Sequence, residues 1–173
     1  MRIISVNPGW RHTGIAVFRG SDLDDWRVKS IRHRTADEIY GIMTATLDDL
    51  AETYGVKVLA MKKLHPARSS RNLRELTTEV KRWAAKRGLV VRDFSIKEVE
   101  SSFLSLGMLN KARLVEEVVA RYPVLCSELE IGGRSHSPYS IRMFEAVALG
   151  MKCLSDLEKE KGRKIILTNH EKQ

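Results

Sequence analysis

The sequence lacks most of the features that characterise secreted, zinc-binding and membrane proteins. Its 173 residues include two cysteines, which do not form a CxxC pair, and five histidines without the spacing of a metal site. A disulfide framework and a zinc site are therefore not expected. No apolar run approaches the roughly 18 residues that a membrane span needs, and no signal peptide is expected at the N-terminus. We expect a reduced, cytoplasmic protein with no membrane partner.

What remains has the composition of a globular protein. Hydrophobic residues make up 43% of the chain and charged residues 30%, which is ordinary for that class. A chain of this length can bury a full core as one domain. We expect this domain to span residues 1–154, followed by a highly charged C-terminal tail at 155–173.

The positive charge of the chain is concentrated in one segment. The formal net charge is +8, and residues 62–92 hold ten basic and two acidic residues, so that the rest of the chain is neutral overall. A localised positive field is typical of proteins that bind a polyanion, most often nucleic acid. The alternative is a solvated basic helix face that serves solubility.

The first eighteen residues predict two strands joined by a stiff turn. Two short apolar runs flank Asn7-Pro8-Gly9, which is a strand-loop-strand pattern. Pro8 fixes its own φ and favours an extended Asn7, and Gly9 and Gly14 permit backbone angles that other residues avoid. The side chain of Asn7 should then be held rigidly at the end of a buried strand. An ordinary hairpin, in which Asn7 satisfies its own turn, is the alternative.

Periodicity and capping signals predict the remaining elements. We expect strands near 25–31, 56–61 and 89–91, helices over 35–54, 71–87, 95–103, 110–121 and 137–154, and a loop over 124–137 that contains Gly132-Gly133. This order predicts an α/β fold: a mixed five-stranded sheet, its first three strands antiparallel, with helices on both faces. For Ile165-Ile166-Leu167, an edge strand and a docking segment both remain open.

Four stretches within residues 1–154 resemble the RuvC-type Holliday-junction resolvases of the RNase H-like superfamily. The family's first strand, whose Asp-Pro-Gly opens the active site, is matched by IISVNPGWRHTGIAVF. The strand that bears a Glu, with its following helix, is matched by VKVLAMKKLHPARSSRNL. SFLSLGMLNKARLVEEVV resembles a Gly-containing loop and a basic helix, with Lys111 on a family lysine. SIRMFEAVALGMKCL resembles a C-terminal helix that carries Asp-x-x-Asp.

The resemblance implies four carboxylates that hold two magnesium ions, which activate water for phosphodiester cleavage. This chain departs from that set. The matching positions are Asn7, Lys62, Arg142 and Glu145, so one acid remains beside an amide and two cations. Mg²⁺ prefers carboxylate oxygens, and we therefore expect no metal and no other cofactor here. Glu145 should pair either with Arg142 on its own helix or with Lys62 across the site.

Three functions are compatible with these observations. The first is a catalytically inactive RuvC-like domain that binds nucleic acid, with DNA as the expected partner and a homodimer as a possible state. Its expected binding residues are Lys62, Lys63, Arg68, Arg71, Arg74, Lys81, Arg82 and Lys111. The second is an active, Mg²⁺-dependent endodeoxyribonuclease whose rebuilt site combines Glu145 with Asp93, Glu98 or Glu100. The third is a scaffold in which the fold serves oligomerisation.

Overall fold

A computed structural model of the chain describes residues 1–32, 34–103, 111–131 and 138–170. Its strands are β1 (Arg2–Asn7), β2 (His12–Arg19), β3 (Asp22–Ser30), β4 (Val58–Lys62) and β5 (Val90–Phe94). The described strands form one five-stranded sheet in the order β3-β2-β1-β4-β5. β1, β2 and β3 pair antiparallel, whereas β4 lies parallel to β1 and β5 lies parallel to β4. The predicted mixed sheet is confirmed.

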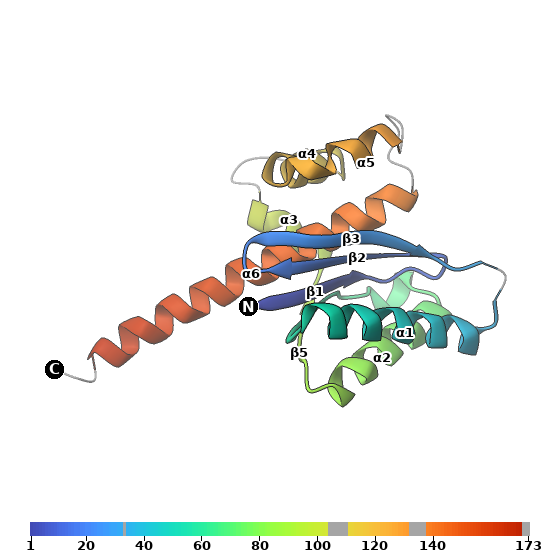
Figure 1. Cartoon of the computed structure of the whole chain (residues 1–173), viewed down its shortest axis with the longest axis horizontal. Coiled ribbons are helices and arrows are strands. Elements are labelled where there is room, and N and C mark those ends of the chain that lie inside the picture. The colour runs from blue at the N-terminus through green and yellow to red at the C-terminus, as the bar shows by residue number, and fades with distance from the viewer. Residues whose placement is uncertain (33, 104–110, 132–137, 171–173) are drawn as a thin grey trace.

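Helices cover both faces of this sheet (Figure 1). They are α1 (Ala36–Tyr54), α2 (Arg71–Lys86), α3 (Ile96–Phe103), α4 (Lys111–Arg121), α5 (Cys126–Ile131) and α6 (Pro138–His170), with short 3₁₀ turns at Pro66–Arg68 and Pro123–Leu125. α1 and α2 pack against one face, and α6 crosses the other beneath α3, α4 and α5. None of the described helices is long and apolar enough to cross a membrane.

Alternation along the central strands divides the core into two layers. Ile3 of β1 belongs to the core under α6, whereas Ile4 and Val6 belong to the core under α1 and α2. The same alternation in β4 sends Ala60 toward α6 and Met61 toward α1 and α2. Because both faces are covered, these strands are nearly continuous apolar runs. Asn7 and Lys62 therefore end their strands on the α6 side.

α6 is much longer than the sequence pattern predicts. It was expected to end near residue 154, and this expectation is wrong, because the helix continues to His170. The stretch after 154 is rich in Lys and Glu, which are strong helix formers, and a Lys152–Asp156 pair at 2.6 Å supports it. Ile165-Ile166-Leu167 lies in this helix, so the edge-strand alternative is also wrong. The division into a domain at 1–154 and a tail stays a prediction.

The predicted loop over 124–137 is partly helical. It begins in the 3₁₀ turn at Pro123–Leu125 and continues as α5 over Cys126–Ile131. α5 has only six residues, fewer than two helical turns, so its apolar residues do not repeat often enough to show helical periodicity. Gly132-Gly133 and Ser137, like Gly107 in the preceding connection, lie outside the described residues.

Glycines allow α6 to approach the sheet at backbone distance. A Cβ atom at Gly14 would lie 1.8 Å from the carbonyl oxygen of Arg142, and one at Gly150 would lie 2.0 Å from the ring of Phe18. Neither Gly9 nor Gly14 has a positive φ, so these two positions do not use the backbone freedom that glycine permits. Their role is spatial: a Cβ at Gly9 would also collide, at 2.2 Å, with the carbonyl of His12.

Gly14→Ala is therefore expected to destabilise the fold by about 1–3 kcal/mol, the usual cost of overpacking. The new methyl group would push α6 away from β2 at the turn that carries Arg142. Gly41→Ala is the matched control, because a Cβ at this exposed α1 position meets nothing within 4 Å and should stabilise the helix by up to about 1 kcal/mol. Urea unfolding of both variants measures the difference, and equal stabilities would contradict the close approach.

Candidate functional site

The four positions that the sequence resemblance matches to the family's acids lie together at the carboxyl ends of β1 and β4. Lys62 Nζ lies 2.8 Å from Glu145 Oε2, and Asn7 Nδ2 donates to the same oxygen at 2.7 Å. β1 and β4 are parallel neighbours, so their last residues meet at one edge of the sheet, and Glu145 reaches this edge from α6. The ion pair is well buried, with the side chain of Glu145 5% exposed and that of Lys62 21%.

Arg142 occupies the outer side of this cluster. Its guanidinium donates to the carbonyl of Pro8 at 3.2 Å and to Asn7 Oδ1 at 3.5 Å. Asn7 Nδ2 donates in turn to the carbonyl of Arg142 at 3.3 Å. Of the two pairings open to Glu145, the structure selects Lys62, because the guanidinium of Arg142 is directed to the turn after β1 instead.

Thr13 holds that turn in place, and the sequence pattern did not single it out. Its hydroxyl donates to the carbonyl of Gly9 at 3.0 Å and accepts from the amide of Gly9 at 3.2 Å. Thr13 is fully enclosed, at 1% exposure. Both hydrogen bonds lock the loop that presents Asn7 and Pro8, which explains why a polar residue is tolerated inside the sheet.

A magnesium ion does not fit this arrangement. Mg²⁺ needs several hard oxygen ligands around an open position. Here a single carboxylate oxygen already accepts from an amide and an ammonium. Within the described ranges, no group of three or more His, Cys, Asp or Glu residues could hold a metal ion. The side chains instead form a hydrogen-bonded cluster with one ion pair and one additional cation.

The three acids considered for a rebuilt site have different surroundings. Asp93 pairs with Lys81 on α2, and Glu98 caps α3 by accepting from the amide of Ser95 at 2.7 Å. Burial, and next the negative charge of Glu145, raise the pKa of Glu100. Of these acids, Glu100 is thus the one near enough to Glu145 to influence it, whereas the other two have structural partners.

The basic segment is less exposed to a ligand than its net charge suggests. Acids from within and outside the segment neutralise six of its ten cations: Lys62–Glu145, Arg71–Glu75, Lys81–Asp93, Arg82–Glu79, Arg87 with Asp48 and Glu52, and Arg92–Glu160. A charge count along the sequence misses acids that fold against a segment from α1 and α6.

Three of the four remaining cations follow Lys62 within twelve residues of the chain. Lys63, Arg68, Arg74 and Lys86 have no ion pair with a described residue. The first two belong to the connection between β4 and α2, and Arg74 closes it by donating to the carbonyls of Pro66 and Ser69 at 3.1 and 3.0 Å. Lys111, the first residue of α4, is exposed on the other side of the sheet.

Comparison with known proteins gives matches in structure but not in sequence. No protein-family model and no curated protein sequence matches the chain. Thermus thermophilus RuvC in complex with a Holliday junction substrate has a TM-score of 0.68 at 16% identity, over 88% of this chain and 91% of that one. The yeast mitochondrial Holliday junction resolvase Ydc2 has a TM-score of 0.61 at 13% identity, over 91% and 80%.

A viral resolvase extends the same comparison. Fowlpox virus resolvase with its Holliday junction DNA has a TM-score of 0.51 at 10% identity, over 87% of this chain and 99% of that one. The three matches cover 87–91% of this chain and 80–99% of the solved chains. The chain therefore has the RuvC-like, RNase H-type fold of the Holliday-junction resolvases, as its sequence motifs implied.

Proposed function

We propose that this chain is a RuvC-like domain that binds nucleic acid and does not cleave it. The observation that carries the proposal is the shared oxygen of Glu145, which accepts from Lys62 at 2.8 Å and from Asn7 at 2.7 Å. An ammonium ion stands where a metal-dependent nuclease needs a cation with open coordination positions. Glu145 is the one acid among the four matched positions, and its Oε2 already accepts two hydrogen bonds, so it is poorly placed to recruit a metal or to activate water.

DNA is the proposed partner. Two structural neighbours are complexes of a resolvase with Holliday junction DNA. In this chain, Lys63 and Arg68 on the connection after β4, and Arg74 in the first turn of α2, carry positive charge that no described acid neutralises. Lys and Arg side chains supply most of the phosphate contacts in such complexes. A cytoplasmic location and a homodimer belong to the same proposal.

Binding and cleavage assays on duplex, single-stranded and four-way DNA test this proposal. With Mg²⁺ or Mn²⁺ present, we expect a mobility shift without nicking. Metal-dependent nicking that is abolished by Glu145→Gln would establish the active nuclease instead. If no DNA causes a mobility shift, the proposal of nucleic-acid binding is refuted and the scaffold function remains. Sedimentation of the chain alone would then test whether it oligomerises.

We expect the locally unpaired cations to dominate the salt dependence of binding. Replacement of Lys63, Arg68 and Arg74 by Ala should reduce the slope of log K against log salt by up to about 0.9 per lost phosphate contact. The matched control replaces Arg71, Lys81 and Arg82, which pair with Glu75, Asp93 and Glu79. Fluorescence anisotropy at several salt concentrations provides the slopes, and an equal change in both triple variants would refute the assignment.

A further inference from the structure

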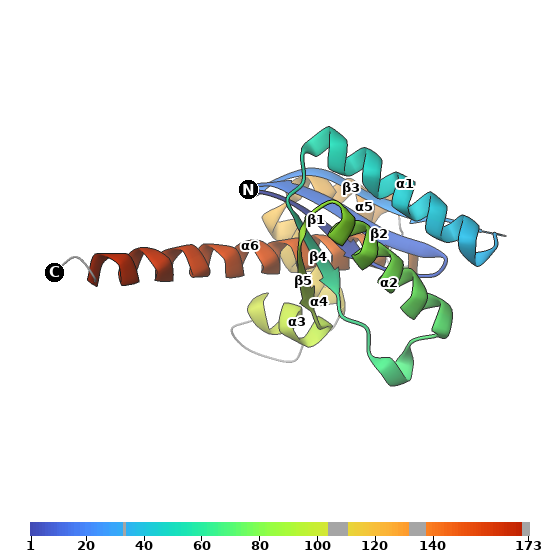
Figure 2. The same ribbon diagram turned by 90° about the horizontal axis from the view of Figure 1, so that it is seen from below.

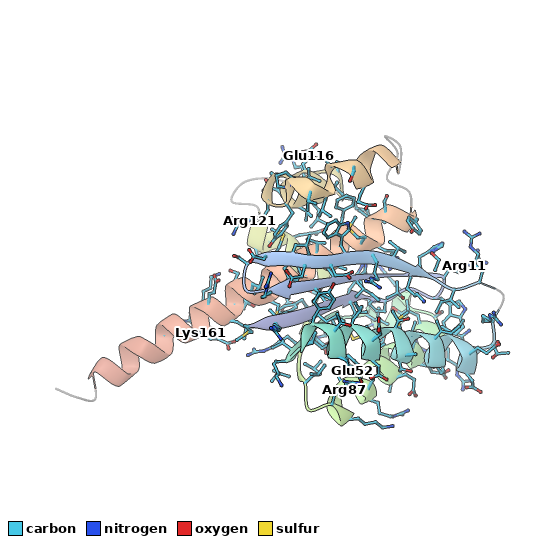
Figure 3. All side chains as sticks on the ribbon, viewed as in Figure 1. Arg11, Glu52, Arg87, Glu116, Arg121 and Lys161 are labelled. Carbon is cyan, nitrogen blue, oxygen red and sulfur yellow. The ribbon has the colours of Figure 1, made fainter. Side chains whose placement is uncertain are left out.

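Apart from the cluster at Asn7, a polar pocket lies at the end of the sheet from which the β1–β2 loop extends. Its volume is about 540 Å³, and its lining comes from that loop, the start of β2, the β3–α1 connection and the first turn of α1: Trp10, Arg11, His12, Ile31, Arg32, Arg34 and Ile39. Figure 3 labels Arg11 at this end, opposite to the projecting part of α6. Small-molecule sites typically have volumes of about 300–1,000 Å³.

The pocket is held by interactions between its two loops. The amide of Ile31 donates to the carbonyl of Arg11 at 3.0 Å, and His12 Nδ1 lies 2.8 Å from Ser30 Oγ. Trp10 packs edge-on against Tyr40, with ring centroids 6.3 Å apart. Ile31 is buried in the core between the sheet and α1 and forms an apolar floor. The concavity is therefore part of the folded scaffold.

Positive charge surrounds this apolar floor. Arg34 pairs with Glu38 at 3.2 Å, whereas Arg11 and Arg32 have no ion pair with a residue in the described ranges. Burial, and then the charges of Arg32, Arg11 and Arg142, lower the pKa of His12. The charges of guanidinium groups from two loops and from α6 thus act on His12, and Arg142 also donates to Asn7 in the cluster.

We propose that this pocket binds a nucleoside phosphate. The guanidinium groups of Arg11 and Arg32 bind the phosphate, because their planar donors match its oxygens. The base lies against Trp10 and the floor at Ile31 and Ile39, since an aromatic ring and an apolar surface accept the face of any base. The ligand is either a free mononucleotide or an unpaired nucleotide of a bound nucleic acid, and the second source rests on the proposed function.

Tryptophan fluorescence offers a local measurement. Trp26 donates to Glu128 at 3.3 Å, and Trp83 donates to Asp48 at 2.7 Å, so both lie outside this pocket. Titration with dAMP is expected to quench the emission of the wild-type chain, and Trp10→Phe should remove this quenching. Adenosine, which lacks the phosphate, should bind at least about tenfold more weakly than dAMP because charged hydrogen bonds are the stronger ones.

Arginine variants complete the test. Arg11→Ala with Arg32→Ala is expected to weaken dAMP binding at least about tenfold, a typical effect of losing charge-assisted contacts. Arg19→Ala is the matched control, since Arg19 lies at the opposite end of β2 and pairs with Asp24. All three positions are on the surface, and circular dichroism checks that the fold is retained. Equal affinity for dAMP in the wild type and the double variant would overturn the proposal.

Polynucleotide ligands separate this inference from the proposed function. If the pocket serves bound nucleic acid, the double variant should lose affinity for a single-stranded oligonucleotide while its affinity for blunt duplex changes little. Quenching by dAMP without binding of any polynucleotide would support a mononucleotide site and refute the proposed function. Duplex binding without any response to dAMP or to the single strand would refute the pocket and leave the proposed function intact.

Discussion

The triple variant Asn7→Asp, Lys62→Glu, Arg142→Asp is expected to bind Mn²⁺ or Mg²⁺, whereas the wild-type chain is expected to bind neither at this site. The scaffold already directs Asn7 and Lys62 to within 2.7 and 2.8 Å of one Glu145 oxygen. With acids at all four positions, the cluster has the hard oxygen ligands that these ions prefer. Isothermal titration calorimetry on both proteins measures the difference.

The same variant should be less stable than the wild type without metal and should recover when metal is added. Four neighbouring carboxylates repel one another, and a ligand that binds the folded state stabilises it by mass action. Lys62→Gln with Arg142→Asn is the control, because it removes both cations without adding acids and should bind no metal. If the triple variant also binds none, the four side chains do not form a ligand set. Cleavage is a weaker readout, since catalysis needs placement to about 0.5 Å.

Loss of the ammonium at Lys62 is expected to have the largest effect of any single substitution in the cluster. Lys62→Met should destabilise the fold by about 3–5 kcal/mol at neutral pH, because it leaves the carboxylate of Glu145 without its cation. The double variant Lys62→Met, Glu145→Gln should regain much of this stability, since the amide still accepts from Asn7 and carries no charge. Urea unfolding of the wild type, of the single variants Lys62→Met and Glu145→Gln, and of the double variant forms the double-mutant cycle.

Arg142→Met provides the comparison on the same side of the sheet. It removes hydrogen bonds to Pro8 and Asn7, so a smaller loss of about 0.5–1.5 kcal/mol is expected. The loss of unfolding free energy caused by Lys62→Met should be smaller in acid, because protonation neutralises the carboxyl group that has lost its cation. The loss caused by Arg142→Met should not change in this way. Equal losses for both variants at every pH would show that the ion pair contributes no special stability.

The fold was predictable because its determinants are mostly local. The burial of β1 follows from its apolar run, and α1 begins at the predicted capping box of Thr35 and Glu38. The convergence of Asn7, Lys62 and Glu145 followed from the resemblance together with the parallel pairing of β1 and β4. The order of the four motifs along the chain predicted that these residues meet, and no pattern within a single segment could have done so.

Features that depend on contacts between distant parts of the chain were harder to predict from the sequence. Gly14 looked like a turn residue, but its neighbour is the backbone of Arg142, which is far away in the sequence. The partner of Glu145 depended on the direction of the Arg142 side chain. The ion pairs of Arg87 with α1 and of Arg92 with α6 neutralise part of the basic segment, which a charge count cannot show. The arginines of the pocket at Trp10 lie in two loops that carry no motif.

The length of α6 has a mechanical consequence. Figures 1 and 2 both show its C-terminal half extending past the sheet, away from the other elements. α6 stays packed on the sheet through Gly150 and Cys153, so its projecting part begins near Leu154. The 16 residues that follow Leu154 add about 24 Å to the helix, so a bend of about 5° there would displace the far end by about 2 Å. A small change in the direction of α6 where it leaves the sheet would thus be magnified at its tip.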